Sequence, residues 1–150
     1  MPLTEVGQAA VDGYEDLSLD NPRMRCESTS ILFDWTFDGP VNRIIQTTNT
    51  VVLRYGQMNL ERTIHLNQAK PPAGVKPSRA GYSIGRWEGD TLVVETTNFL
   101  PGVLTGSVAH SDQLKVVERF TLDPKTMRLT REYQATDPLH FKGTYSGRDV

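Results

Sequence analysis

The sequence predicts an all-β protein, an antiparallel up-and-down β-barrel of about eight strands preceded by a short N-terminal helix. From residue 31 onward, apolar and polar residues alternate in short runs, which is the period of a strand with one buried face. Turn residues separate most of these runs, and parallel pairs would need crossovers of a dozen residues or more, so most neighbouring strands are expected to pair antiparallel. A two-sheet sandwich also fits, but we favour a barrel because closure removes exposed sheet edges.

Residues 1–30 are predicted as an N-terminal helix and lead-in segment packed on the barrel, and residues 31–150 as the single barrel domain. The run EVGQAAVDGY indicates a short helix, with Thr4 as its N-cap and Leu3 as a hydrophobic staple. A helix of this length is unstable alone, so it must pack on a larger structure.

The first half of the barrel is expected to begin with a short aromatic-rich strand over Ile31–Phe37, which ends at the turn Asp38-Gly39-Pro40. A three-stranded meander follows, because turn residues separate the next alternating runs. Residues 68–80 contain three prolines and no strand pattern, which predicts a long loop. The strands of the meander are Val41–Thr47, Thr50–Tyr55 and Leu60–Leu66.

The second half contains two predicted hairpins and a last strand. Glu88-Gly89-Asp90 forms the tight turn of the first hairpin, and Asp123-Pro124-Lys125-Thr126 forms a type I turn in the second. Residues 98–111 show little periodicity and are predicted as a second long loop. The expected strands are Gly81–Trp87, Thr91–Thr97, Gln113–Leu122, Met127–Thr136 and Leu139–Ser146.

Composition excludes several classes of protein. A chain of 150 residues buries roughly two thirds of its unfolded surface, which suits one domain. Sixteen Lys and Arg residues against 18 Asp and Glu residues leave no cationic excess, so nucleic-acid binding is not expected. No apolar run approaches the ~20 residues of a membrane span, and the first residues lack the pattern of a signal peptide. The single cysteine, Cys26, excludes an internal disulfide, and we expect it to be buried.

Strand alternation places several polar side chains on faces that are otherwise apolar. Burying an unpaired charge costs several kcal/mol, so these groups must pair with one another or line a wet cavity. One interpretation is a structural Arg–Glu pair that joins strands, and the other is a ligand pocket with a carboxylate base. The inward polar residues are Tyr55, Arg62, Glu118, Arg131, Tyr133 and Tyr145.

The catalytic hypothesis assigns a role to each of five residues. Glu118 is the base, because an apolar lining would raise its pKa by desolvation. Arg62 binds an oxyanion or carboxylate, and His110 or Tyr55 acts as the acid. Asp112 comes two residues after His110, and its carboxylate could fix the tautomer of the His110 imidazole. Glu95 is a second carboxylate candidate.

Aromatic residues near strand ends are candidates for lining a pocket for an apolar or aromatic molecule. No HxH or HExxH spacing supports a metal site, and no Gly-rich phosphate loop occurs, so neither a metal nor another cofactor is expected. His140 alternates outward and is predicted to be exposed. The predicted ligand-binding residues are Trp35, His65, Tyr82, Trp87, Arg131 and Tyr133.

The block GYSIGRWEGDTLVVETTNF at residues 81–99 resembles the signature G-[HY]-S-[IV]-G-R-W-E-G-D-T-L-V-V-E-T of a large family of uncharacterised bacterial proteins. The resemblance spans roughly residues 3–141, through NPRMRC, RTIHL and HSDQLKVVERF. It implies a calycin-like or lipocalin-like barrel and export to the periplasm or medium, but no particular reaction. Tyr82 stands where relatives usually have His, and the loop at residues 68–79 also departs from the family pattern.

These observations predict a cofactor-independent acid/base enzyme of lyase, isomerase or cyclase type, acting on an apolar or aromatic small molecule inside the barrel. The alternative is a lipocalin-like binding protein without catalysis. A third interpretation makes the Arg–Glu set a structural clasp in a protein that binds a partner through its two long loops. The sequence does not fix the oligomeric state, and a homodimer is one of the states it allows.

Overall fold

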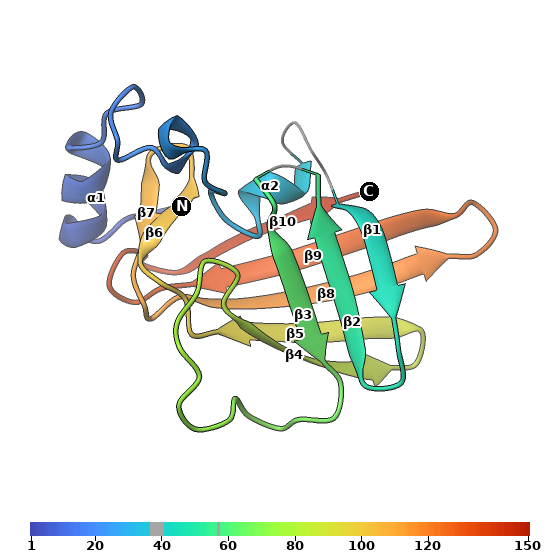
Figure 1. The fold of residues 1–150 in the computed structure, drawn as a ribbon. Coiled ribbons are helices and arrows are strands. Elements are labelled where there is room, and N and C mark those ends of the chain that lie inside the picture. The colour runs from blue at the N-terminus through green and yellow to red at the C-terminus, as the bar shows by residue number, and fades with distance from the viewer. Residues whose placement is uncertain (37–40, 57) are drawn as a thin grey trace.

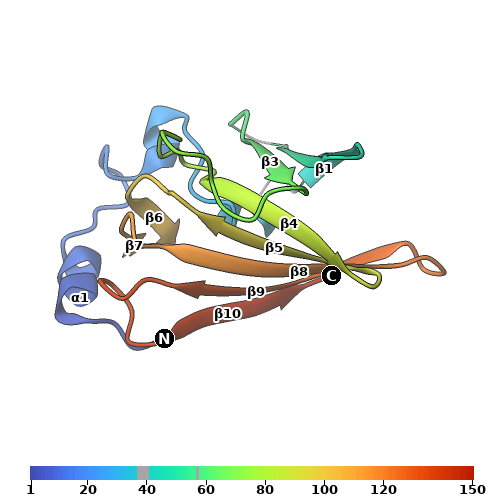
Figure 2. The ribbon, with the colours of Figure 1, turned by 90° about the horizontal axis from the view of Figure 1, so that it is seen from below.

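The protein is built on one strongly curled sheet of eight strands, which forms a half-barrel (Figures 1 and 2). The computed structural model describes residues 1–36, 41–56 and 58–150. Along the sheet the order is β1-β2-β3-β4-β5-β8-β9-β10, so β1 and β10 are its edges. The strands are β1 (Val41–Gln46), β2 (Thr50–Tyr55), β3 (Glu61–His65), β4 (Tyr82–Glu88), β5 (Thr91–Thr97), β8 (Lys115–Asp123), β9 (Arg128–Thr136) and β10 (Thr144–Asp149).

This architecture confirms the predicted all-β, barrel-like fold of about eight strands with a short N-terminal helix, and the eight strands curl into a half-barrel. The predicted meander is β1–β3, and the predicted hairpins are β4–β5 and β8–β9. One pair departs from the antiparallel pattern, because β3 and β4 run parallel with Ile64 opposite Ser83. The proline-containing loop between them is long enough to return the chain to the starting end of β3, as a parallel pair requires.

Helix α1 (Glu5–Asp12) forms where the sequence predicts it. The Thr4 hydroxyl accepts a hydrogen bond from the Gly7 amide at 3.0 Å, which satisfies one of the free amides of the first turn. Leu3 pairs with Phe141 in an isolated bridge, and the Thr4 amide donates to the His140 carbonyl at 3.0 Å. These contacts fasten the helix to the segment before β10, as its marginal length requires.

The predicted strand at residues 31–37 is wrong, because helix α2 (Phe33–Thr36) occupies most of it. The Ser30 hydroxyl accepts from the Leu32 and Phe33 amides at 3.2 and 3.1 Å, so it caps the helix start. Asp34 accepts in turn from the Thr29 and Ser30 amides. This local hydrogen bonding outweighs the β-preference of the aromatic residues. Phe37 and the predicted turn Asp38-Gly39-Pro40 lie outside the described residues.

Two further segments differ from expectation. The predicted loop at residues 98–111 contains the hairpin β6 (Gly102–Thr105) and β7 (Val108–His110), whose turn has Gly106 at φ +54°. The last strand begins at Thr144 rather than Leu139, because the Asp137 carboxylate accepts from the Leu139 amide at 3.0 Å and forms a turn there. A short 3-10 helix, η1 (Pro22–Arg25), lies before α2.

The core lies on the concave face of the sheet, beneath α2, and is mostly aliphatic. Two sequence predictions about burial are wrong. His140 is buried because α1 packs on its backbone, and Cys26 is exposed at the end of η1 with φ 58°. Met127, the first residue of the predicted strand at residues 127–136, is 72% exposed and takes a left-handed conformation (φ 54°) at the turn before β9.

Candidate functional site

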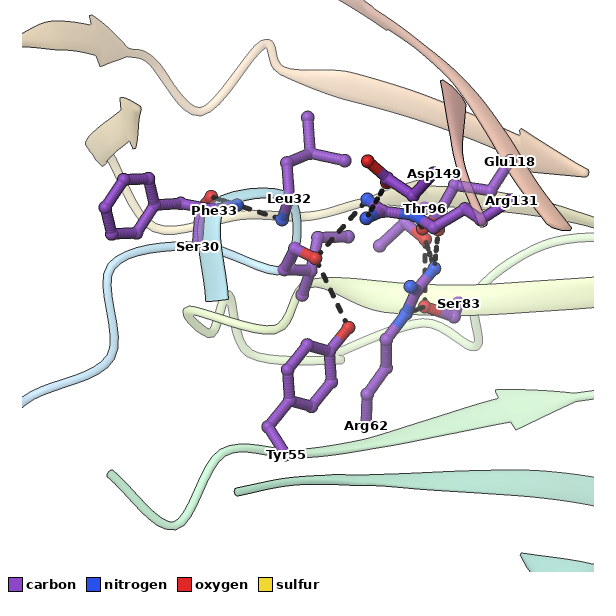
Figure 3. Close-up of polar contacts among 11 residues, drawn as sticks. Ser30, Leu32, Phe33, Tyr55, Arg62, Ser83, Thr96, Glu118, Arg131 and Asp149 are labelled. Carbon is purple, nitrogen blue, oxygen red and sulfur yellow. Dashed lines mark hydrogen bonds and ion pairs between the residues drawn. The ribbon is translucent and has the colours of Figure 1, made fainter. Parts of the chain in front are cut away.

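A buried charge cluster lies on the concave face of the curled sheet, with its charged side chains on strands that are not all neighbours (Figure 3). Arg62 of β3, Glu118 of β8 and Arg131 of β9 are at most 1% exposed, as strand alternation predicts. The Arg131 Nε donates to Glu118 Oε1 at 2.9 Å, and the Arg62 Nη2 donates to Glu118 Oε2. Both oxygens of the carboxylate are therefore held by guanidinium groups.

Polar side chains that sequence reasoning missed complete the cluster. The Arg62 Nε donates to Ser83 Oγ at 2.8 Å, and its Nη2 donates to Thr96 Oγ1 at 2.6 Å. The Arg131 Nη1 donates to Asp149 Oδ2 at 3.1 Å. Ser83 and Thr96 are opposite each other on β4 and β5, at inward positions, so alternation contained a signal for them. Asp149 was missed because the last strand was expected to end at Ser146.

Aromatic rings and one backbone carbonyl close the cluster on its other side. The Tyr55 hydroxyl donates to the Ile31 carbonyl at 3.3 Å, and the Arg131 Nη2 donates to the same oxygen at 3.4 Å. The Arg131 guanidinium lies 4.7 Å from the ring centroids of both Trp35 and Tyr133, a cation–π geometry. The predicted residues Tyr55, Trp35 and Tyr133 therefore cover this side of the cluster.

The charges of the cluster balance, with Arg62 and Arg131 opposite Glu118 and Asp149. Burial raises the pKa of the Glu118 carboxyl, but the guanidiniums of Arg62 and Arg131 outweigh burial and hold that pKa below its usual value. The sequence predicted the opposite direction for Glu118, because it showed the apolar lining and not the convergence of two arginines. Burial raises the pKa of the Tyr55 hydroxyl, which stays protonated.

The structure does not bring His110 into contact with this cluster. Its Nδ1 lies 3.0 Å from the Ser111 carbonyl, so Nδ1 carries the hydrogen of the neutral ring. Burial lowers the pKa of His110 below its usual value. The acid beside this segment is Asp137 rather than the Asp that follows His110 in sequence. The Asp137 carboxylate accepts from the Ser111 amide at 2.5 Å and from its hydroxyl at 2.9 Å, which fixes the turn before β8.

Three other candidates also lie apart from the cluster. Glu95 is on the opposite face of the sheet, where its carboxylate pairs with the exposed Lys115 at 2.7 Å. The rings of His65 and Tyr82 stack at 4.6 Å between centroids with 9° between planes. The Tyr82 hydroxyl donates to the Gln68 side chain at 2.5 Å. None of these three residues lines the apolar pocket at the end of the half-barrel.

An apolar pocket of about 160 Å³ opens at one end of the half-barrel. Trp35 and Trp87, both predicted as ligand-binding residues, are the only tryptophans of the chain, and both line it. Gln46 and Asp90 are its polar lining residues. Residues at its mouth that are about half exposed include Ile44, Trp87 and Leu122.

The pocket and the charge cluster are successive layers on the same three strands. Side chains two residues apart on a strand share a face, so each of the three strands contributes side chains to both layers. Trp35 separates the layers, because its ring packs on Phe120 at 5.4 Å on the pocket side and beneath Arg131 on the other. The three pairs, pocket residue first, are Ile64 with Arg62, Phe120 with Glu118, and Leu129 with Arg131.

Comparisons with protein-family models, with curated proteins and with solved structures found no match. Within the described ranges, no group of three or more His, Cys, Asp or Glu side chains is placed to hold a metal ion. In the same part of the chain, no helix has the length and apolar character needed to cross a membrane.

Proposed function

We propose that this protein binds a small apolar or aromatic molecule in the pocket at the end of the half-barrel. The observation that carries the proposal is the pocket itself, which is apolar except for two side chains and measures about 160 Å³. A dry cavity of about 150 Å³ accepts a molecule the size of benzene. The pocket therefore suits a single ring or a short alkyl chain.

The pocket mouth supports the same proposal. Ile44, Trp87 and Leu122 each leave nearly half of their surface in water while they line the entrance. Clustered exposed apolar side chains are commonly binding sites, because water contact with them is unfavourable. A bound ring would bury these side chains and the two indoles together.

The geometry favours binding over the acid/base enzyme. A general base must reach a substrate proton with a free oxygen, and both oxygens of Glu118 are engaged by arginine. Its lowered pKa also makes it a weak base. We assign the cluster a structural role: it ties β3, β8 and β9 together beneath the pocket and holds the pocket wall in one shape.

The experiment is a titration of the protein with toluene, followed by tryptophan emission excited at 295 nm. A single-ring ligand is expected to give saturable quenching with a dissociation constant of about 1 mM, or roughly −4 kcal/mol. Val51→Phe, which fills the pocket from a buried lining position, should abolish the response. Met127→Ala, at an exposed position outside the pocket, should leave it unchanged.

The proposal fails if the wild-type protein shows no saturable response, or if folded Val51→Phe responds as the wild type does. Thermal melts of each variant establish that it is folded before titration. Family membership, export to the periplasm or medium and a homodimer stay predictions, and sedimentation equilibrium would test the last of them.

A further inference from the structure

Asp90 is the acidic residue of the pocket mouth. It follows Gly89 in the tight turn between β4 and β5, where Gly89 has φ +60°. The Asp90 carboxylate makes no ion pair or side-chain hydrogen bond with any residue that the structure describes. The neighbouring carboxylate of Glu88, in contrast, pairs with Arg86 at 2.8 Å and with Arg119 at 3.0 Å. Asp90 is thus the unpaired acid of this hairpin.

Among the pocket-lining residues that the structure describes, none carries a basic side chain to balance Asp90. The Arg131 guanidinium packs against the pocket-lining Trp35 and is already neutralised by Glu118 and Asp149. The second polar lining residue, Gln46, is neutral. Among the described lining residues, a ligand that enters the pocket therefore meets apolar walls and one negative charge, that of Asp90.

We propose that the pocket selects ligands with an apolar ring or chain that ends in a positively charged amine. This inference rests on the proposed binding function and names the ligand class of the same site. The ring would occupy the space between Trp35 and Trp87, and the ammonium group would face Asp90 at the mouth. The Trp87 indole, three residues from Asp90, offers the ammonium a π face as well. A carboxylate ligand such as a fatty acid would meet repulsion at the same place.

Three probes of matched size separate charge from apolar fit: 2-phenylethylamine, 2-phenylethanol and phenylacetate. Each is titrated at pH 7 and low ionic strength, with tryptophan emission as the readout. An exposed ion pair contributes modestly, so we expect the amine to bind about threefold tighter than the alcohol and about tenfold tighter than phenylacetate. The preference should shrink in 1 M salt, where charges are screened beyond ~3 Å.

Asp90→Asn should remove the amine preference and leave the affinity for 2-phenylethanol unchanged. Glu88→Gln is the matched control, because it removes the same charge from the same hairpin at a residue that does not line the pocket. This control should keep most of the preference.

The inference is overturned if the three probes bind equally, if phenylacetate binds tightest, or if Asp90→Asn keeps the preference. In those cases 2-phenylethanol still binds, and the proposed function stands. If no probe binds, the proposed function and this inference fail together.

Discussion

Replacing Glu118 by Gln should cost the protein much of its stability, because it leaves two buried arginines without their shared partner. The amide keeps the shape of the side chain but removes its charge. Arg62 and Arg131 would then be balanced by Asp149 alone, which contacts only the second of them. Removing one partner of a buried pair costs about 3–5 kcal/mol, and Glu118 serves two partners, so we expect about 4–5 kcal/mol. Native domains have about 5–15 kcal/mol in total.

The assay is urea denaturation followed by tryptophan emission, since Trp35 lies directly on the Arg131 guanidinium. Glu95→Gln is the matched control: it makes the same chemical change in the exposed pair with Lys115 and should cost less than about 1 kcal/mol. A variant with Arg62→Met, Glu118→Leu and Arg131→Met should be more stable than Glu118→Gln, because no buried arginine is left unpaired. The structural role of the cluster is refuted if Glu118→Gln costs no more than Glu95→Gln.

Two further predictions concern helix docking and pH. Gly7→Ala should destabilise the protein by about 1–3 kcal/mol despite the better helix propensity of Ala, because the new Cβ would lie 2.2 Å from the His140 carbonyl oxygen. Gly13→Ala is the control and should leave stability unchanged, because Gly13 has φ −89° and a Cβ there would lie 3.4 Å from its nearest neighbour, the Ala9 carbonyl oxygen. Equal urea midpoints for the two variants would contradict the close packing of α1 on His140. Burial lowers the pKa of His110, so its stabilising effect is complete above the unfolded pKa of about 6.5 and is lost as pH falls below that value. His110→Gln should flatten the fall in urea midpoint between about pH 7 and 5, and an unchanged slope would rule out His110 as its source.

Strand alternation alone was enough to predict three of the four charged residues of the cluster, all but Asp149. Arg62, Glu118 and Arg131 each replace an apolar residue in a period-two pattern, so their inward direction could be read locally. The same pattern does not say which inward charges meet. The direction of the Glu118 pKa depends on two arginines from different strands, and so it could not be derived from the β8 sequence.

Helix α2 and the acidic partner of the His110 segment were harder to predict, because each depends on contacts that the strand pattern does not contain. Helix α2 depends on the Ser30 cap and on Asp34, which together stabilise one turn against the strand preference of its aromatic residues. His110 was paired in the prediction with the acid nearest in sequence. The structure instead places Asp137 beside this segment, where its carboxylate accepts a hydrogen bond from Ser111, 26 residues earlier in the chain.

By itself the sequence determined a β-rich fold, a capped N-terminal helix, most strand boundaries and the inward direction of the three buried charges. These features follow from local rules, since capping residues and side-chain alternation act within a few residues. Only the tertiary structure decided that β3 pairs parallel with β4 and that Trp35 separates the charges from the apolar pocket. It also placed Asp90 at the mouth of that pocket. These depend on the curl of the sheet, which brings strands distant in sequence together.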